Sequence, residues 1–192
     1  MDDLLPDHSW FGVGRNDGKN AGEFSPVFYR HDKVELLDSG TFWLSTTPEV
    51  PGSKSWDAAI TRIAVWGKFK MKSDNNEFYF FNTHFDHRGE VARINSASLI
   101  LEKIQEIAAA MPVVLSGDFN VSPDSEAYQT IKKDLRDAGE VSQVSSYGPH
   151  GTFGGFTVEL DEPMNRIDHL FVSDSVKVSR HGVLSDQWNG RY

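Results

Sequence analysis

The most informative stretch of the sequence is Pro112-Val113-Val114-Leu115-Ser116-Gly117-Asp118-Phe119-Asn120. It is an apolar run followed by a carboxylate, Asp118, and a carboxamide, Asn120. A short apolar run bounded by a turn signal predicts a buried strand. Because side chains i and i+2 of a strand point to the same face, Asp118 and Asn120 are expected to converge. Gly117 allows backbone or ligand to approach closely. Asp and Asn also favour turns through their own backbone bonds, so the pair alone is more often a simple turn.

Two further segments place polar side chains on apolar strands. Asn82-Thr83-His84-Phe85-Asp86-His87 follows the apolar run of residues 78–81. Arg166-Ile167-Asp168-His169-Leu170-Phe171 sets Asp168 within an apolar stretch. Three such strands, each ending in or interrupted by His, Asp or Asn, indicate one polar site at the edge of a sheet.

Length and composition indicate one globular domain spanning residues 1–192, long enough to bury a core. The absence of cysteine excludes disulfides, thiolate metal sites and a cysteine nucleophile. No stretch approaches the roughly 20 apolar residues of a membrane span. The acidic start lacks the layout of a signal peptide. We therefore expect a soluble chain of undetermined compartment, cytoplasmic unless a further N-terminal segment carries an export signal.

The pattern of strands and helices predicts an α+β layered domain. Residues 26–30 and 34–44 are expected to form a hairpin through His31-Asp32-Lys33, and residues 45–56 a surface loop. A helix is predicted over residues 90–111, and a second from Ser122 as N-cap, with Pro123 at the first helical position, to about Arg136. Further strands are expected at 60–70, 77–85, 113–116, 152–153, 166–173 and 176–184.

The order of these segments resembles the endonuclease/exonuclease/phosphatase superfamily, the DNase I-like metal-dependent phosphoesterases. The likeness runs from about Gly12 to the end of the chain. It rests on residues 22–30 (GEFSPVFYR), 61–66 (TRIAVW), 82–84 (NTH), 117–120 (GDFN), 151–153 (GTF) and 166–168 (RID). The resemblance implies a four-layered α/β/β/α sandwich, here a partial domain that is incomplete at both ends.

The resemblance also implies hydrolysis of a phosphoester bond with Mg²⁺ or Mn²⁺ as cofactor, which suits oxygen ligands. Asp118 is the candidate for orienting and deprotonating the attacking water, and Asn120 for holding a phosphate oxygen. His84 matches the active-site histidine of the family's Asn-x-His motif. Asp168 matches the aspartate that orients a histidine further along the chain.

Five other residues are candidates for substrate contacts, each with a structural alternative. Arg62 and Tyr29 would contact substrate anions or instead pair with acidic residues at the sheet edge. His87 is also explained as a surface histidine at the start of a helix. Trp56 and Phe153 would line the cleft, although aromatic residues are first of all packing residues.

Two pieces of the family pattern are absent from this chain. The first comprises the initial strands, which carry an Asn and the metal-binding Glu; Glu23 comes too late in the order to be that ligand. The second is the final Ser-Asp-His strand, and His150, His169 and His181 all lie in the wrong context to replace its histidine. The metal ligand is therefore unassigned. We expect a fragment of a longer protein that alone binds Mg²⁺ weakly and hydrolyses little.

Three functions fit this pattern. The first is hydrolysis of a small, sugar- or lipid-linked phosphoester, and the second is cleavage of nucleic acid. The third is non-catalytic binding by a relative that keeps the fold. The net charge of −9 and the lack of a basic patch argue mildly against non-specific nucleic-acid binding. The sequence indicates no oligomeric state.

Overall fold

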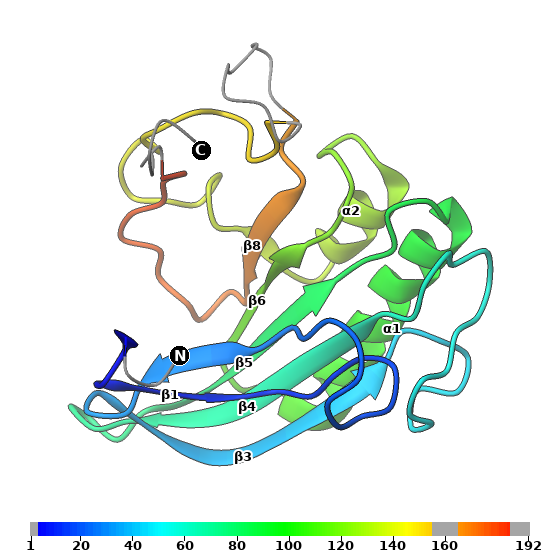
Figure 1. Ribbon diagram of the computed structural model, residues 1–192. Coiled ribbons are helices and arrows are strands. Elements are labelled where there is room, and N and C mark those ends of the chain that lie inside the picture. The colour runs from blue at the N-terminus through cyan, green and yellow to red at the C-terminus, as the bar shows by residue number, and fades with distance from the viewer. Residues whose placement is uncertain (1–3, 155–164, 185–192) are drawn as a thin grey trace.

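The computed structural model describes residues 4–154 and 165–184 (Figure 1). Six strands form one mixed sheet in the order β3-β4-β5-β6-β8-β7, and β1 and β2 form a separate two-stranded sheet. The strands are β1 (His8–Phe11), β2 (Val27–Arg30), β3 (Val34–Trp43), β4 (Ile63–Met71), β5 (Glu77–His84), β6 (Val113–Asp118), β7 (Arg136–Asp137) and β8 (Asp168–Val172). The helices are α1 (Glu90–Ala108) and α2 (Glu126–Ile131).

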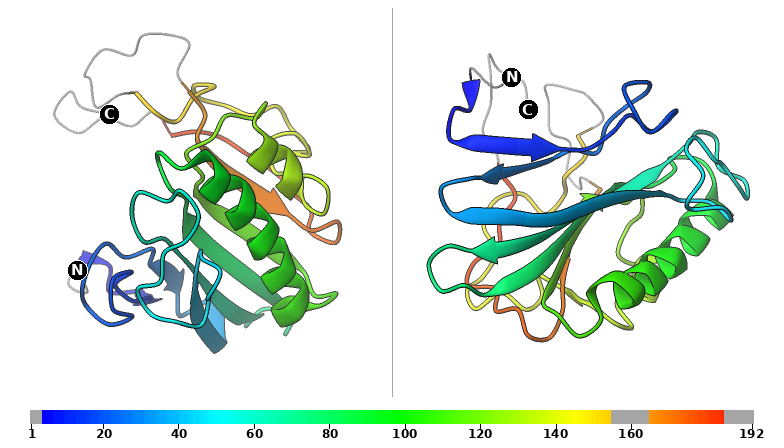
Figure 2. Two further views of the ribbon diagram at one scale, coloured as in Figure 1. Left: turned by 90° about the vertical axis from the view of Figure 1, so that its right-hand side faces the viewer. Right: turned by 90° about the horizontal axis from the view of Figure 1, so that it is seen from below.

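The large sheet is covered on both faces. Helices α1 and α2 lie on one face and β1–β2 on the other (Figure 2). Strand β4 shows how alternation serves both layers, since Ala64 belongs to the core under the helices whereas Val65 and Phe69 belong to the core under β1–β2. The fold is α+β, and the described residues form three layers of the expected sandwich.

Parallel pairing of β5 with β6 sets the position of the polar site. Parallel neighbours need a crossover connection, and α1 supplies it. The register places His84 opposite Asp118, and the antiparallel pairing of β6 with β8 places Asp118 opposite Asp168. Three residues that are distant in sequence therefore lie side by side at one edge of the sheet.

The predicted hairpin between residues 26–30 and 34–44 is wrong. Strand β2 pairs with β1, and β3 pairs with β4. Val27 and Tyr29 pack on Phe69 of β4 from the opposite layer, so β2 lies over the large sheet and not beside β3. The turn at residues 31–33 therefore carries the chain from one layer to the other.

Three other predicted elements differ from the structure. Helix α2 starts later than expected, because the Oγ of Ser125 accepts the N–H of Tyr128 (3.2 Å) and acts as N-cap, whereas the Ser122 hydroxyl bonds the carboxylate of Asp124. The helix ends at Ile131. Residues 176–184 do not form the predicted strand; their pairing with the rest of the described chain is a single bridge, between Gly182 and Tyr147. The strand predicted at 152–153 is likewise one bridge, from Phe153 to Asn165.

Asp86 ties the segment before β4 to the start of α1. Its carboxylate, only 2% exposed, accepts the backbone N–H groups of Ile60 (3.1 Å), Arg88 (2.9 Å) and Gly89 (2.7 Å). Burial disfavours the charged form, but these donors outweigh it and lower the pKa of Asp86 to about 2. The ionised carboxylate therefore stabilises the folded state.

We expect Asp86→Asn to lower the free energy of unfolding at pH 7 by about 2 kcal/mol. This is the free energy that corresponds to lowering the pKa of Asp86 from 3.8 to about 2. The folded pKa is the lower one, so the contribution is complete above the unfolded pKa and is lost as pH falls from about 4 to about 2. Urea unfolding at pH 7 and pH 3 measures this, with the exposed Asp134→Asn as control. An equal loss at both pH values would contradict it.

Candidate active site

The strand ends bring three of the predicted catalytic residues together. His84 is the last residue of β5, Asp118 the last of β6 and Asp168 the first of β8. The Nε2 atom of His84 lies 3.3 Å from Oδ2 of Asp118. An acid, a histidine and a second acid thus share one sheet edge, and the backbone pairing fixes their spacing.

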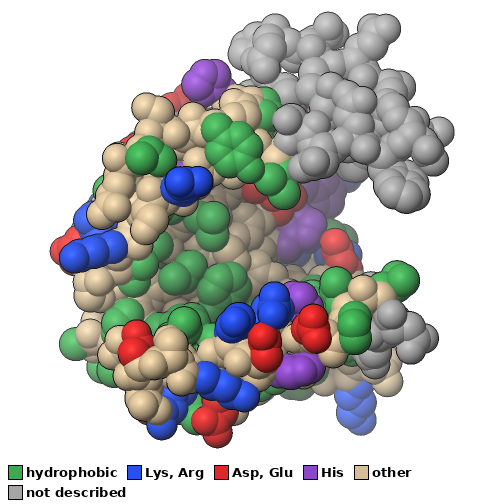
Figure 3. Space-filling view, turned by 90° about the vertical axis from the view of Figure 1, so that its left-hand side faces the viewer, with side chains coloured by type: hydrophobic (Ala, Val, Ile, Leu, Met, Phe, Trp, Pro, Cys, Tyr) green, Lys and Arg blue, Asp and Glu red, His purple; other side chains and the backbone are tan. Residues whose placement is uncertain are grey.

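These three residues line a cleft of about 480 Å³. Its lining also includes residues 24–26, which precede β2, and residues 181–183. The face drawn in Figure 3 is hollowed, and histidine, acidic and basic side chains gather at one end of the hollow. The cleft is large enough for a small phosphoester.

Gly117 and Asn120 shape the end of β6. Gly117 has a φ of 156°, and a Cβ atom there would lie 2.2 Å from the carbonyl oxygen of Thr83, so only glycine fits. Asn120 has a φ of 50°, its N–H donates to Asp118 (2.9 Å), and its Nδ2 donates to the carbonyl of Phe85 (3.1 Å). Asn120 does not line the cleft. Its side-chain nitrogen, Nδ2, links the end of β6 to the end of β5.

The two aspartates differ in their affinity for a proton. Burial opposes ionisation of Asp118, but the contact with His84, the N–H of Asn120 and the charge of Arg62 outweigh it, so the pKa of Asp118 lies below its usual value. Burial raises the pKa of Asp168; the hydrogen bond from Thr152 opposes this effect and the charge of Asp118 adds to it. The site therefore pairs an ionised acid with one that retains its proton more readily.

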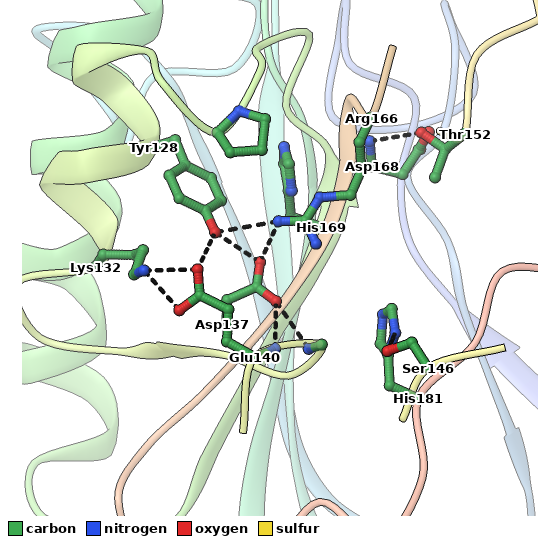
Figure 4. Close-up of polar contacts among 12 residues, drawn as sticks. Tyr128, Lys132, Asp137, Glu140, Ser146, Thr152, Arg166, Asp168, His169 and His181 are labelled. Carbon is green, nitrogen blue, oxygen red and sulfur yellow. Dashed lines mark hydrogen bonds and ion pairs between the residues drawn. The ribbon is translucent and has the colours of Figure 1, made fainter. Parts of the chain in front are cut away.

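Contacts on both sides hold the start of β8 (Figure 4). The Oγ1 of Thr152 accepts the N–H groups of Ile167 (3.0 Å) and Asp168 (3.1 Å). On the other side, Arg166 Nη2 donates to Oδ2 of Asp137 at 2.6 Å. The backbone that presents Asp168 to the cleft is thereby fixed.

His181, which the sequence context had set aside, lies in the cleft wall. Its Nδ1 is 2.9 Å from the hydroxyl oxygen of Ser146 (Figure 4). Its segment follows β8 in a stretch that was expected to be a strand, and sequence periodicity gave no signal that it turns toward the site.

Glu23 is a second residue that sequence reasoning missed. Its Oε1 atom lies 3.4 Å from Nδ1 of His84, on the side of the ring opposite Asp118. Its Oε2 atom pairs with Arg15 and lies 3.6 Å from Nη1 of Arg62. The residue stands in the segment 22–30 that carries the resemblance, but strand order alone gave it no place at the site.

The five candidates for substrate contact lie outside the residues that line the cleft. Arg62 is 5% exposed, and its Nε and Nη1 atoms are buried without a hydrogen-bond partner in the described part of the chain. The alternation of β2 turns Tyr29 toward the core, where its ring contacts Phe69 of β4 and Phe11 of β1. The other three are exposed: His87, Trp56 (36%) and Phe153 (38%).

Residues 4–154 and 165–184 contain no group of three or more His, Cys, Asp or Glu side chains arranged to hold a metal ion. Asp118 faces His84 with one oxygen and the N–H of Asn120 with the other. The described residues therefore do not by themselves fit a resident metal.

No helix within the described residues is long and apolar enough to cross a membrane.

Two of the solved structures with the same architecture come from Bacteroides species. The mannosyl-6-phosphatase of Bacteroides thetaiotaomicron superposes with a TM-score of 0.92 and is 46% identical, over 98% of this chain and 71% of that one. An endonuclease/exonuclease/phosphatase from Bacteroides vulgatus gives a TM-score of 0.92 and 44% identity, over 97% of this chain and 72% of that one.

Sequence comparison identifies further relatives of this chain. Nocturnin of Drosophila melanogaster is 25% identical over 130 residues, which cover 66% of this chain and 18% of that protein. The chain spans less than a third of each of three curated relatives. A model of the Endonuclease/Exonuclease/phosphatase family matches residues 16–189. With its strand order and its His84–Asp118 pair, the chain therefore belongs to the endonuclease/exonuclease/phosphatase family.

Proposed function

We propose that the protein hydrolyses a phosphate ester carried by a sugar. The observation that carries the proposal is the contact of 3.3 Å between His84 and an Asp118 of lowered pKa at the edge of a cleft. The mannosyl-6-phosphatase at 46% identity supports a sugar monophosphate as the substrate class.

In the proposed reaction, Asp118 accepts a proton from the attacking water. The water oxygen bonds to phosphorus as the bond from phosphorus to the sugar oxygen breaks. The leaving sugar oxygen takes up a proton from solvent to form the sugar alcohol, phosphate is released, and Asp118 returns its proton to solvent. Asn120 fixes the carboxylate through its N–H. His84 lines the cleft, and its Nε2, which lies 3.3 Å from Asp118 in the structure, would exchange that contact for a hydrogen bond to a phosphoryl oxygen, where negative charge must be stabilised.

The family resemblance implies Mg²⁺ or Mn²⁺ as cofactor, although the described residues do not assemble a metal site. A divalent ion supplies charge stabilisation in phosphoester hydrolysis. The chain's own groups in the proposed reaction are the carboxylate of Asp118, the backbone N–H of Asn120 and the imidazole of His84.

The test measures hydrolysis of three substrates by the full-length protein, in the presence of Mg²⁺ and again after the metal has been removed by a chelator. We expect phosphate release from mannose 6-phosphate to exceed hydrolysis of bis(p-nitrophenyl) phosphate, with little nicking of supercoiled plasmid. Dominant nicking would identify a nuclease. Binding of the sugar phosphate without turnover of any substrate would identify a non-catalytic relative.

A further inference from the structure

We propose that His181 is a specificity-determining residue whose imidazole binds a hydroxyl group of the sugar while the phosphate lies at His84 and Asp118. The inference rests on the proposed function and deepens it, because it names the side chain that recognises the leaving sugar. His181 lines the same cleft as His84 and Asp118, and the proposed reaction gives it no role.

The floor of the cleft continues beyond the acids onto an uncharged surface. Asp168 and Leu170 both line the cleft, and strand alternation places them on the same face of β8. Two residues along a strand span roughly 7 Å. In the register of β6 with β8, Leu170 lies opposite Ser116, which also lines the cleft. A sugar that extends from the acids along β8 therefore lies over an apolar side chain and a hydroxyl group, not over further charges.

His181 and Gly182 stand at the far end of this uncharged floor. They line the cleft and also a neighbouring hollow of about 580 Å³, and Leu170 is common to both linings. Val172, two residues further along β8, lines the hollow but not the cleft. The segment thus separates the two spaces, and a sugar that passes over Leu170 meets His181.

The ring of His181 is held along one edge. Its Nδ1 atom lies 2.9 Å from the hydroxyl oxygen of Ser146 (Figure 4). A Cβ atom at Gly139 would lie 3.2 Å from Cε1 of His181, so the same edge packs against the turn after β7. Within the described part of the chain only Nδ1 is hydrogen-bonded, which leaves Nε2 for a ligand. A sugar hydroxyl both donates and accepts, so it suits Nε2 in either tautomer.

Contacts between two loops place the backbone of His181. The N–H of Tyr147 donates to the carbonyl of His181 (3.4 Å), and the N–H of Val183 donates to the carbonyl of Tyr147 (3.0 Å). Gly182 lies against the ring of Tyr147, where a Cβ atom would come within 2.2 Å of Cε1. The histidine is therefore positioned before any substrate binds, which lowers the entropic cost of the contact.

The chain offers a matched control for substitution of this histidine. His181→Gln removes the ring and keeps a polar side chain, and Ser146→Ala removes the partner of Nδ1. His31 is an exposed histidine whose Nδ1 lies 3.4 Å from the hydroxyl oxygen of Ser9, and it does not line the cleft. His31→Gln therefore removes a similar histidine–serine pair at a distance from the site.

Kinetics of the full-length protein with two phosphate esters give the first measurement. Mannose 6-phosphate carries sugar hydroxyls, and p-nitrophenyl phosphate has none. We expect His181→Gln to raise KM for mannose 6-phosphate roughly three- to tenfold, the effect of losing one hydrogen bond to a neutral group, and to leave KM for p-nitrophenyl phosphate unchanged. Ser146→Ala should have a smaller effect of the same kind, and His31→Gln none. An equal change with both esters, or no change with either, would overturn the proposal.

Binding without turnover separates this inference from the proposed function. Mannose 6-phosphate or inorganic phosphate is added to full-length Asp118→Asn, which preserves the ester, and the ring nitrogen signals of His84 and His181 are followed by long-range ¹H–¹⁵N correlation. We expect the sugar phosphate to move the signals of both histidines and inorganic phosphate to move those of His84 alone.

The possible results distinguish the two proposals. Movement of the His84 signals alone by mannose 6-phosphate would overturn the role of His181 and leave the proposed function in place, as would a response of His181 to inorganic phosphate. Movement of both sets of signals, in a protein whose wild type hydrolyses neither ester, would support the sugar contact and overturn the proposed function. No movement of either set would overturn both.

Discussion

Replacing Asp118 with asparagine is expected to lower kcat by roughly 10²-fold or more, the scale of losing general-base assistance. Asparagine keeps the shape of the side chain and an oxygen to accept the N–H of Asn120, which lies 2.9 Å from the carboxylate in the structure. It removes the group whose lowered pKa leaves it free to accept a proton from water at neutral pH. Substrate binding should change less, because His84 remains.

The measurement is kcat and KM with the preferred phosphoester at saturating Mg²⁺, using the full-length protein. Asp134→Asn, an exposed aspartate, controls for the loss of one charge. Urea unfolding of each variant separates lost chemistry from lost folding. Near-full turnover by Asp118→Asn would show that Asp118 is structural and that the proposed mechanism is wrong.

Local sequence patterns predicted the parts of the site that belong to single strands. The apolar run before Asp118 and the one before His84 both form strands, and both residues stand at strand ends. Their closeness depends on the register between β5 and β6, which no local pattern contains. The family resemblance implied the layered sandwich and gave these residues roles in one active site.

Sequence reasoning failed where a choice depended on another layer of the fold. The turn at residues 31–33 fits a hairpin and a change of layer equally well, and only packing of Tyr29 on Phe69 decides for the latter. Glu23 reaches His84 because its loop is bonded to Trp43 of β3, a long-range contact.

The start of α2 shows a similar limit. Ser122 and Ser125 are both good N-cap residues, and Pro123 favours the earlier start. The structure uses Ser125. The choice is settled by how Tyr128 is buried, with its hydroxyl bonded to Asp137, and that pairing cannot be read from local propensity.

Asp137 gives the second large expected effect. Its carboxylate is 1% exposed and accepts hydrogen bonds from the Tyr128 hydroxyl (2.8 Å), the Arg166 guanidinium (2.6 Å) and the Gly139 N–H (2.8 Å) (Figure 4). Removing one member of a buried ion pair leaves the other uncompensated, which costs about 3–5 kcal/mol. We expect Asp137→Ala to lower the free energy of unfolding by that amount at pH 7.

The loss should depend on pH in a defined direction. Burial opposes ionisation of Asp137, but the Tyr128 hydroxyl and Arg166 outweigh it and hold the pKa below its usual value. The stabilisation is therefore complete above the unfolded pKa of about 4 and is lost as pH falls through the lower folded pKa. The difference between wild type and Asp137→Ala should shrink as the pH is lowered from 7 to 3.

Urea unfolding at both pH values measures this effect, with Asp134→Ala as the exposed control. Asp137→Asn keeps the volume and an acceptor, so it should fall between wild type and Asp137→Ala at pH 7. Because Arg166 leads directly into the backbone that presents Asp168, the loss of this anchor should also reduce kcat in the full-length protein. If Asp137→Ala lowers the free energy of unfolding by less than about 1 kcal/mol at pH 7, which is what an exposed ion pair contributes, β8 is held in place without Asp137.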